Sequence, residues 1–186
     1  VKVGEEIVRV WPDDKKAWVG LGKYYLQTEE YQKGLATMEV AFKNGYFENE
    51  VEYKVLANFY SLNEIPYKAA VTLEKAIKEE KVKRTKQNVN AVASNYHRSK
   101  DIEKAAKYYE EAAKFDDVRL NKALELGSDK KGTIYSDLAE AYYYQGKYKQ
   151  AYAAIVKAMD DPRTRKFAKG WSTYIKDKAA RNGVKI

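Results

Sequence analysis

The stretch WVGLGKYYLQTEEYQKGLATMEVA, residues 18–41, decides the fold, because its pattern returns three more times along the chain. Stretches that begin at Tyr53, Val89 and Tyr135 align with it in a frame of about 34 positions. Three positions of this frame hold only glycine or alanine in all four copies. These are Gly22, Ala57, Ala93 and Ala139 at position 8, Gly34, Ala69, Ala105 and Ala151 at position 20, and Ala41, Ala76, Ala112 and Ala158 at position 27.

Large residues recur in the same frame, with tyrosine at position 11 of every copy: Tyr25, Tyr60, Tyr96 and Tyr142. Apolar residues three and four positions apart predict two amphipathic helices in each copy. Small residues let the two helices approach closely, and the aromatic ring fills the space beside them. Turns are predicted at TEE, NEI, SKD and QGK. A single hairpin cannot bury its apolar face, so the sequence predicts an all-α solenoid of stacked helical hairpins.

This pattern resembles the tetratricopeptide repeat (TPR) family over residues 15–165. Residues that stand where the family consensus places them are Trp18, Leu21, Gly22, Tyr25, Tyr31, Gly34 and Ala41. Pro66 departs from the consensus, which has tyrosine at that place. The resemblance implies that the hairpins form a right-handed superhelix.

We expect a single array over residues 1–186, in which one repeat is incomplete. Position 27 steps by 46 residues from Ala112 to Ala158, and Ala123 would divide this step into 11 and 35. We therefore expect that a repeat has lost its first helix between Asp117 and Val118; the alternative is a continuous chain with a short linking helix at 118–126. The expected segments are 1–14 (the end of a truncated repeat), 15–48, 50–83 and 86–117 (repeats), 118–131 (second half of a repeat), 132–162 (repeat) and 163–182 (capping helix).

The capping helix is expected to cover the end of the last hairpin with one apolar face. Phe167, Trp171, Ile175 and Ala179 recur every four residues on that face. The last repeat of a solenoid would otherwise expose its core. A basic amphipathic helix that lies on a membrane surface is the alternative, but the aromatic residues follow directly from the last hairpin, which favours a cap.

Composition excludes several classes of function. The chain has no cysteine and one histidine, so we expect no catalytic site, no metal site and no cofactor. No stretch is long and apolar enough for direct membrane insertion. The net charge of +8 comes from 35 basic residues interspersed with 27 acidic ones, which predicts a solvated surface and no nucleic-acid partner.

The TPR resemblance implies that the first helix of each hairpin lines a concave groove that binds a protein or peptide. Lys54 and Asn58 resemble part of the clamp with which some family members hold a peptide carboxylate. Tyr143 and Tyr144 offer aromatic contact area. The candidate groove residues are Lys16, Lys23, Gln27, Lys54, Asn58, Asn90, His97, Arg98, Glu140, Tyr143 and Tyr144.

Two stretches carry a narrower resemblance, WVGLGKYYLQTEEYQKGLATMEVAFKNGY at 18–46 and GWSTYIKDKAARNGVKI at 170–186. They are similar to TPR proteins associated with TonB energy transduction in Gram-negative bacteria. The resemblance implies a periplasmic, non-catalytic scaffold that assists TonB-dependent uptake, notably of iron, with TonB-system components as partners. One alternative is a cytoplasmic peptide-binding adaptor of the chaperone co-factor type; another is a basic nucleic-acid-associated protein.

Overall fold

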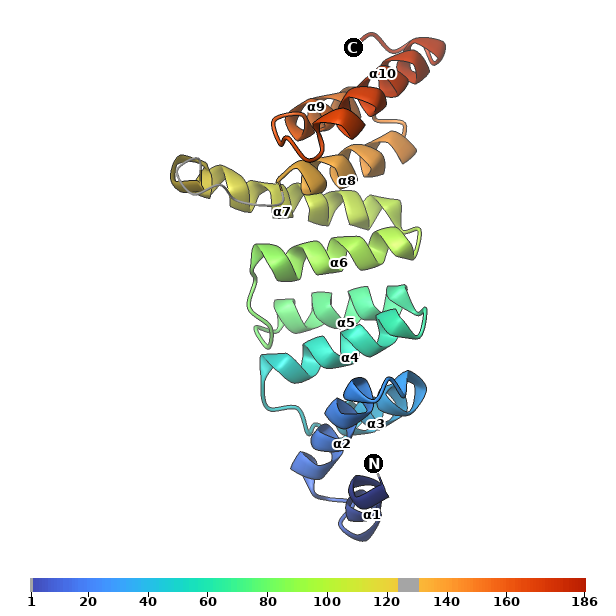
Figure 1. Cartoon of the computed structure of the whole chain (residues 1–186), viewed down its shortest axis with the longest axis vertical. Helices are drawn as coiled ribbons and strands as arrows, with labels where there is room; N and C mark the ends of the chain where they lie inside the picture. The colour runs from blue at the N-terminus through green and yellow to red at the C-terminus, as the bar shows by residue number, and fades with distance from the viewer. Residues whose placement is uncertain (1, 124–130) are drawn as a thin grey trace. The chain divides into compact units, whose positions relative to one another are not determined.

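The computed structural model describes residues 2–123 and 131–186, which form helices joined by turns and contain no strand (Figure 1). The chain divides into two compact units, Val1–Arg84 and Thr85–Ile186, and each is described by itself. Unit 1 contains α1 (Lys2–Val10), α2 (Lys15–Gln27), α3 (Tyr31–Lys43), α4 (Glu50–Leu62) and α5 (Pro66–Lys78). Unit 2 contains α6 (Lys86–Arg98), α7 (Ile102–Ala123), α8 (Lys131–Tyr144), α9 (Tyr148–Ala158) and α10 (Arg165–Arg181). The predicted all-α fold of helical hairpins is confirmed.

The hairpin turns lie where the sequence predicts them. The pairs α2–α3, α4–α5, α6–α7 and α8–α9 pack side by side. One residue in each turn has a positive φ: Glu29 at 60°, Glu64 at 59°, Lys100 at 65° and Gly146 at 72°. This left-handed conformation ends the first helix and reverses the chain. It is strained for every residue except glycine, so three of the four turns depend on the packing of their hairpins.

The small residues at positions 8 and 20 permit close approach of neighbouring helices in unit 1. A Cβ atom on Gly34 would lie 2.3 Å from two ring carbons of Phe59, a side chain that is fully buried. A Cβ atom on Gly22 would lie 2.4 Å from the sulfur of Met38, which is also fully buried. Both glycines leave the space that a large neighbour occupies, as the repeat pattern predicts.

Tyrosines at position 11 of three hairpins, Tyr25, Tyr60 and Tyr142, join their hairpin to the helix before it. The phenol of each donates a hydrogen bond to a glutamate of that helix, and this contact was not foreseen from the sequence. The pairs are Tyr25–Glu5 at 2.5 Å and Tyr60–Glu39 at 2.6 Å in unit 1, and Tyr142–Glu110 at 3.1 Å in unit 2. Since the partners lie 20 to 32 residues apart, these bonds stabilise the stacking of successive hairpins.

Several lysines have structural contacts that account for part of the basic composition. Lys33 Nζ lies 5.7 Å from the ring centroid of Tyr25, and Lys68 Nζ lies 5.4 Å from that of Tyr60. An ammonium group over an aromatic face is attracted by the ring quadrupole. These lysines therefore reinforce the hairpin contacts of unit 1.

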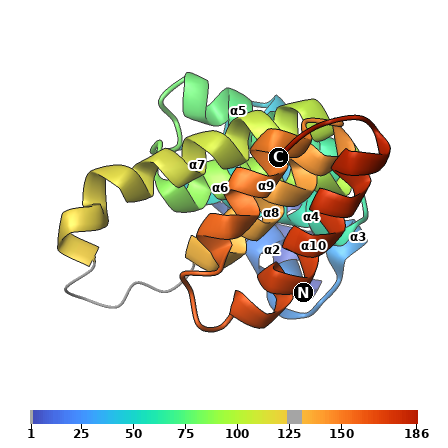
Figure 2. The ribbon, with the colours of Figure 1, turned by 90° about the horizontal axis from the view of Figure 1, so that it is seen from above.

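Helix α7 of unit 2 is longer than its partner in the hairpin. It has 22 residues against 13 in α6, and its C-terminal part projects beyond the neighbouring helices (Figures 1 and 2). Residues 118–123 prolong α7 instead of forming a separate linking helix. Residues 124–130 of the expected half-repeat lie outside the described residues, and the loss of a first helix there stays a prediction.

Helix α10 packs against α9 at the end of unit 2. The expected face is confirmed at Ile175 and Ala179, but Ala168 and Ser172 are buried in place of Phe167 and Trp171. The buried residues of the helix are Ala168, Ser172, Ile175 and Ala179, whereas Phe167 is 53% exposed and Trp171 is only partly buried. The small residues bring α10 close to α9, so the aromatic side chains of α10 stand on the neighbouring face.

Candidate functional site

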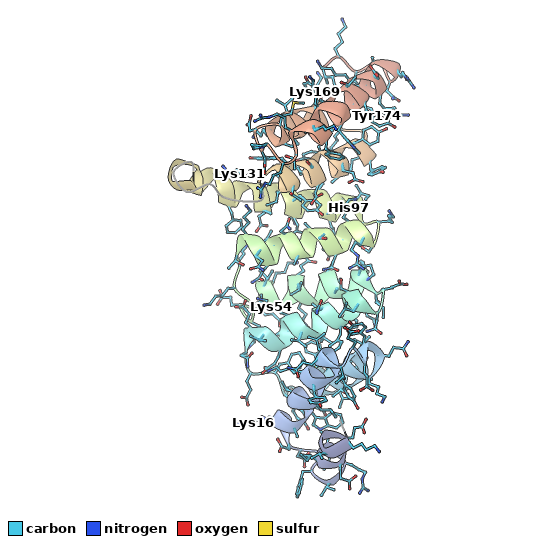
Figure 3. All side chains as sticks on the ribbon, viewed as in Figure 1. Lys16, Lys54, His97, Lys131, Lys169 and Tyr174 are labelled. Carbon is cyan, nitrogen blue, oxygen red and sulfur yellow. The ribbon has the colours of Figure 1, made fainter. Side chains whose placement is uncertain are left out.

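The five candidate groove residues of unit 1 lie on α2 and α4 at or near the surface. Lys23 Nζ lies 3.8 Å from Glu52 Oε1, and Lys54 Nζ lies 3.4 Å from Glu50 Oε1. Because both ammonium groups already face a carboxylate of α4, the structure does not assemble a carboxylate clamp around Lys54. Lys16, Gln27 and Asn58 are exposed and take part in no further grouping (Lys16 and Lys54 are labelled in Figure 3).

Unit 2 brings together candidates from different helices. His97 at the end of α6 faces Glu140 on α8, with Nε2 3.8 Å from Oε1. Their side chains are 20% and 33% exposed, so solvent still reaches both. Asn90 lies two helical turns before His97 on α6, and its Oδ1 is enclosed without a hydrogen-bond partner in the part of the chain that the structure describes. Arg98 is exposed beside His97.

Asp137, which the sequence reasoning missed, lies one turn before Glu140 on α8. Burial, and secondarily the charge of Glu140, raises the pKa of Asp137 from 3.8 to about 6. No hydrogen bond or ion pair from any described residue reaches this carboxyl group. The side chain is therefore held in an environment that disfavours its charged form.

Tyr109 of α7 lies close to His97 of α6 and to Asp137 of α8. Burial, followed by the charge of Asp137, raises the pKa of its phenol, which also has a hydrogen bond with Ser94. Its ring meets the His97 imidazole edge to face, with centroids 6.1 Å apart. We call the following side chains the polar cluster: Ser94, His97, Tyr109, Asp137 and Glu140.

A second group of side chains, the aromatic cluster, joins the end of α8 to α10. Its members are Tyr143, Tyr144, Phe167, Trp171 and Tyr174. The Tyr143 hydroxyl donates to the Tyr174 hydroxyl at 3.0 Å, and this bond is the largest cause that raises the pKa of Tyr143 to about 12. The ring centroid of Tyr143 lies 5.5 to 5.6 Å from the ring centroids of Tyr144, Trp171 and Tyr174.

This aromatic cluster is accessible. Tyr144 is 60% exposed, Tyr174 54% and Phe167 53%. His97 and Tyr174 are on the same side of unit 2, away from Lys131 (Figure 3). Glu140 and Tyr144 are one turn apart on α8, so the polar and aromatic clusters adjoin.

Two signals could have revealed the missed residues. Asp137 stands between the buried residues Ser136 and Leu138 in the run TIYSDLAEA at 133–141, where a carboxylate has no role in packing. Trp171 was missed because the sequence reasoning assigned it, with Phe167, to the buried face of α10, and Tyr174 was given no role at all. Their true position depends on how α10 is rotated against α9.

The described residues include no group of three or more histidine, cysteine, aspartate or glutamate side chains that could hold a metal ion. In the same residues, none of the helices has the length and apolar character that a membrane span requires.

Comparisons with known proteins place the fold. No family model matches the sequence, and no curated protein matches it either. Solved structures do match: YrrB, described as a TPR protein with an unusual peptide-binding site, is 16% identical with a TM-score of 0.70, covering 91% of this chain and 80% of its own. The fold is that of TPR proteins.

Two further TPR structures agree. The C-terminal part of a TPR repeat-containing protein from Cytophaga hutchinsonii is 14% identical with a TM-score of 0.65, and the match covers 98% of this chain and 65% of that one. A putative kinesin light chain from Podosopora anserina with nearly identical TPR-like repeats is 15% identical with a TM-score of 0.63, covering 89% and 87%. At this level of identity the likeness concerns the fold alone.

Proposed function

We propose that this TPR chain is a non-catalytic scaffold that binds a protein or peptide segment on unit 2, over α8 and α10. The observation that carries the proposal is the accessible aromatic cluster. Three of its five members expose more than half of their surface. Contiguous exposed aromatic groups of this kind mark interaction sites on proteins.

The aromatic cluster lies beside the buried face of α10 and leaves three of its rings mostly exposed. Helix α10 meets α9 through Ala168, Ser172, Ile175 and Ala179, which are all buried. The aromatic rings are instead held against one another by edge contacts and by the bond between Tyr143 and Tyr174. Rigid rings lose little conformational entropy when a partner covers them.

The exposed area of the aromatic cluster is large enough to contribute to binding of a peptide. The exposed parts of Tyr144, Phe167 and Tyr174 amount to roughly 100 Å² each, because an aromatic side chain presents about 150–250 Å² in full. At about 25 cal/mol per Å², covering all three contributes on the order of 7 kcal/mol before the costs of association. This contribution offsets a large part of the cost of association, and polar contacts with the peptide must supply the remaining binding free energy. YrrB, whose fold is similar, is itself described as having a peptide-binding site.

The experiment is selection of a displayed random-peptide library on the purified chain. We compare the wild-type chain with the double variant Tyr144→Ser/Tyr174→Ser, and use Tyr24→Ser as the matched control. Tyr24 is 46% exposed but lies on α2 of unit 1. We expect peptides that bind the wild-type chain and the control, and that lose at least tenfold in affinity for the double variant. Equal binding to all three proteins, or no enrichment at all, would overturn the proposal.

The narrower part of the proposal is a periplasmic accessory of a TonB system, and it rests on the sequence resemblance of residues 18–46 and 170–186. The test is binding of the purified periplasmic part of TonB to the chain, measured with and without Tyr144→Ser/Tyr174→Ser. Loss of binding in the double variant supports this assignment. If peptides bind but TonB and its motor subunits do not, the TonB assignment is wrong and the scaffold stands, with a chaperone-type adaptor as its alternative.

The contacts of the lysines favour a protein partner over a nucleic acid. Lys23, Lys33, Lys54 and Lys68 each lie within 4.0 Å of a carboxylate oxygen in unit 1. Lysines that already face acidic groups release few counterions from a phosphate backbone. Steeply salt-dependent binding to an arbitrary DNA duplex would contradict this argument.

A further inference from the structure

The aromatic residues of α10 that belong to the aromatic cluster stand in one row along the helix. Phe167, Trp171 and Tyr174 are spaced by four and three residues, which places them within about 60° of one another around the helix axis. The same spacing continues to Lys178 and Arg181, four and seven residues after Tyr174. We call these five residues the α10 row. Its aromatic rings are therefore followed directly by two basic side chains.

The α10 row stands beside the face of α10 that packs on α9. Each residue of that buried face comes one position after a residue of the row, and the buried residues are Ala168, Ser172, Ile175 and Ala179. One position corresponds to about 100° around the helix. Lys178 and Arg181 are exposed, as are Phe167 and Tyr174, so the contact with α9 leaves both the rings and the charges of the row open to solvent.

The basic residues of α10 differ in what their side chains contact. The helix contains one acidic residue, the exposed Asp177, and six basic residues: Arg165, Lys166, Lys169, Lys176, Lys178 and Arg181. Arg165 Nε donates a hydrogen bond to a main-chain carbonyl oxygen at 2.9 Å, and Lys176 Nζ lies 4.9 Å from the ring centroid of Tyr152. Lys178 and Arg181 make no ion pair with a carboxylate of the described ranges 2–123 and 131–186.

The position of these two cations is not explained by the packing of unit 2. The end of α10 that carries them is on the opposite side of unit 2 from the C-terminal end of α7 (Figures 1 and 2), so the projecting part of α7 supplies no partner. The helix dipole favours basic residues in the last turn of a helix. The dipole accounts for their charge, but not for their alignment with the aromatic rings.

Resting on the proposed function above, we propose that Lys178 and Arg181 bind an acidic side chain, an aspartate or a glutamate, of the protein segment that covers the aromatic cluster. The occupant that matches the α10 row carries an apolar residue for the rings and a carboxylate for the cations. A guanidinium group pairs with a carboxylate through two parallel hydrogen bonds, and the ammonium group adds a second positive charge. The net charge of +8 also favours the approach of an acidic segment.

The geometry of α10 sets the spacing within the bound segment. A helix rises about 1.5 Å per residue, which places Lys178 and Arg181 about 6 and 10 Å along the axis from Tyr174. An extended peptide covers this distance in two or three residues, at about 3.3 Å per residue. We therefore expect the acidic residue to stand two or three positions from an apolar one.

The α10 row fits a protein segment better than a lipid surface. A helix that lies in a membrane interface presents a broad apolar face to the bilayer. One apolar face of α10 is already packed on α9. The exposed apolar part of the row is limited to three rings, and the hydroxyl of Tyr174 accepts a hydrogen bond from Tyr143.

The test uses peptides selected on the wild-type chain, amidated at the C-terminus and labelled with fluorescein at the N-terminus. Amidation removes the terminal carboxylate, so that only a side-chain carboxylate responds. Each peptide is compared with its version in which glutamine replaces glutamate or asparagine replaces aspartate. Both are titrated by fluorescence anisotropy on the wild-type chain, on Lys178→Gln/Arg181→Gln, and on the control Lys169→Gln/Lys176→Gln.

The control removes two positive charges from the other side of α10. Lys169 and Lys176 are exposed and stand two residues after Phe167 and Tyr174, which places them about 200° around the helix from the row. At about 50 mM ionic strength, where exposed charges are weakly screened, we expect the carboxylate to improve affinity for the wild-type chain and the control by about three- to tenfold. In the double variant of the row this improvement should fall below about twofold, while the dependence on the aromatic cluster is retained.

The outcomes separate this inference from the proposed function. Peptides that bind through the aromatic cluster without a preference for carboxylates overturn the inference and leave the scaffold intact. A preference that survives in Lys178→Gln/Arg181→Gln, or that falls equally in the control, also overturns it, because the charge is then recognised elsewhere or only through the net charge of the chain. Absence of any peptide binding overturns both. Circular dichroism of each variant establishes that the chain is folded in every titration.

A lipid surface is tested with the same variants. The chain is sedimented with vesicles of equal parts phosphatidylcholine and phosphatidylglycerol. We expect Lys178→Gln/Arg181→Gln and the control to bind these vesicles equally, since both have lost the same charge. A loss of vesicle binding that is confined to the variant of the row would overturn the inference in favour of lipid headgroups.

Discussion

Replacing Asp137 by asparagine is expected to stabilise unit 2 at neutral pH. In the wild-type chain, burial and the charge of Glu140 raise the pKa of Asp137 from 3.8 to about 6. Folding therefore favours the protonated carboxyl group, and the wild-type chain loses stability as the pH rises from the unfolded value near 3.8 through the folded value near 6. Asparagine has nearly the same shape and does not titrate, so the variant is free of this loss.

The magnitude follows from the pKa shift. A rise from 3.8 to about 6 is roughly two units, and each unit corresponds to about 1.4 kcal/mol, which gives an upper limit of about 3 kcal/mol above pH 6. Asparagine still buries an amide, which reduces the expected gain to about 1–2 kcal/mol at pH 7. At pH 4 the gain should be below about 1 kcal/mol, because the carboxyl group is then largely protonated in the folded chain.

The assay is urea unfolding at pH 4 and pH 7, followed by circular dichroism. With an m-value of about 2 kcal/mol per molar urea, we expect the midpoint of Asp137→Asn to rise by about 0.5–1 M at pH 7. The control Asp177→Asn should leave the midpoint unchanged. A variant that is less stable than the wild-type chain at pH 7, or a gain that is equal at both pH values, would refute the reasoning. Either result would mean that the Asp137 carboxylate is well solvated or paired.

Two further predictions concern the packing of unit 1 and use the same unfolding assay. Gly34→Ala should lower the free energy of unfolding by about 2–4 kcal/mol, because the new Cβ would lie 2.3 Å from the buried ring of Phe59. Gly20→Ala is the control: its new Cβ would meet no atom within 4 Å, so the free energy of unfolding should rise by about 0.5–1 kcal/mol. A similar gain in both variants would contradict the close approach at Gly34. Tyr60→Phe should lose about 1–2 kcal/mol, because it removes the 2.6 Å hydrogen bond to Glu39; an unchanged midpoint would show that this bond does not stabilise hairpin stacking.

The sequence was sufficient to predict the helical hairpins and their turns, although α7 continues to Ala123, beyond the predicted end of its repeat at 117. The small residues at positions 8, 20 and 27, the tyrosine at position 11 and the four turns follow from spacing within a single helix or between two adjacent ones. Periodicity of this kind is a local property that repetition makes unmistakable. Among the candidate groove residues, His97, Glu140, Tyr143 and Tyr144 belong to the two clusters of unit 2.

The tertiary structure decided which residues meet across helices, and therefore where the candidate site is. Asp137 gains its significance only because it is buried near Tyr109 of α7, and no spacing within α8 reveals that environment. In α10 the stripe of Phe167 and Trp171 looks as suitable for burial as the stripe of Ala168 and Ser172. The stripe of small residues is the buried one, because it allows α10 to approach α9 closely. The rotation of a helix about its axis is set by such packing between helices and not by the sequence pattern along one of them.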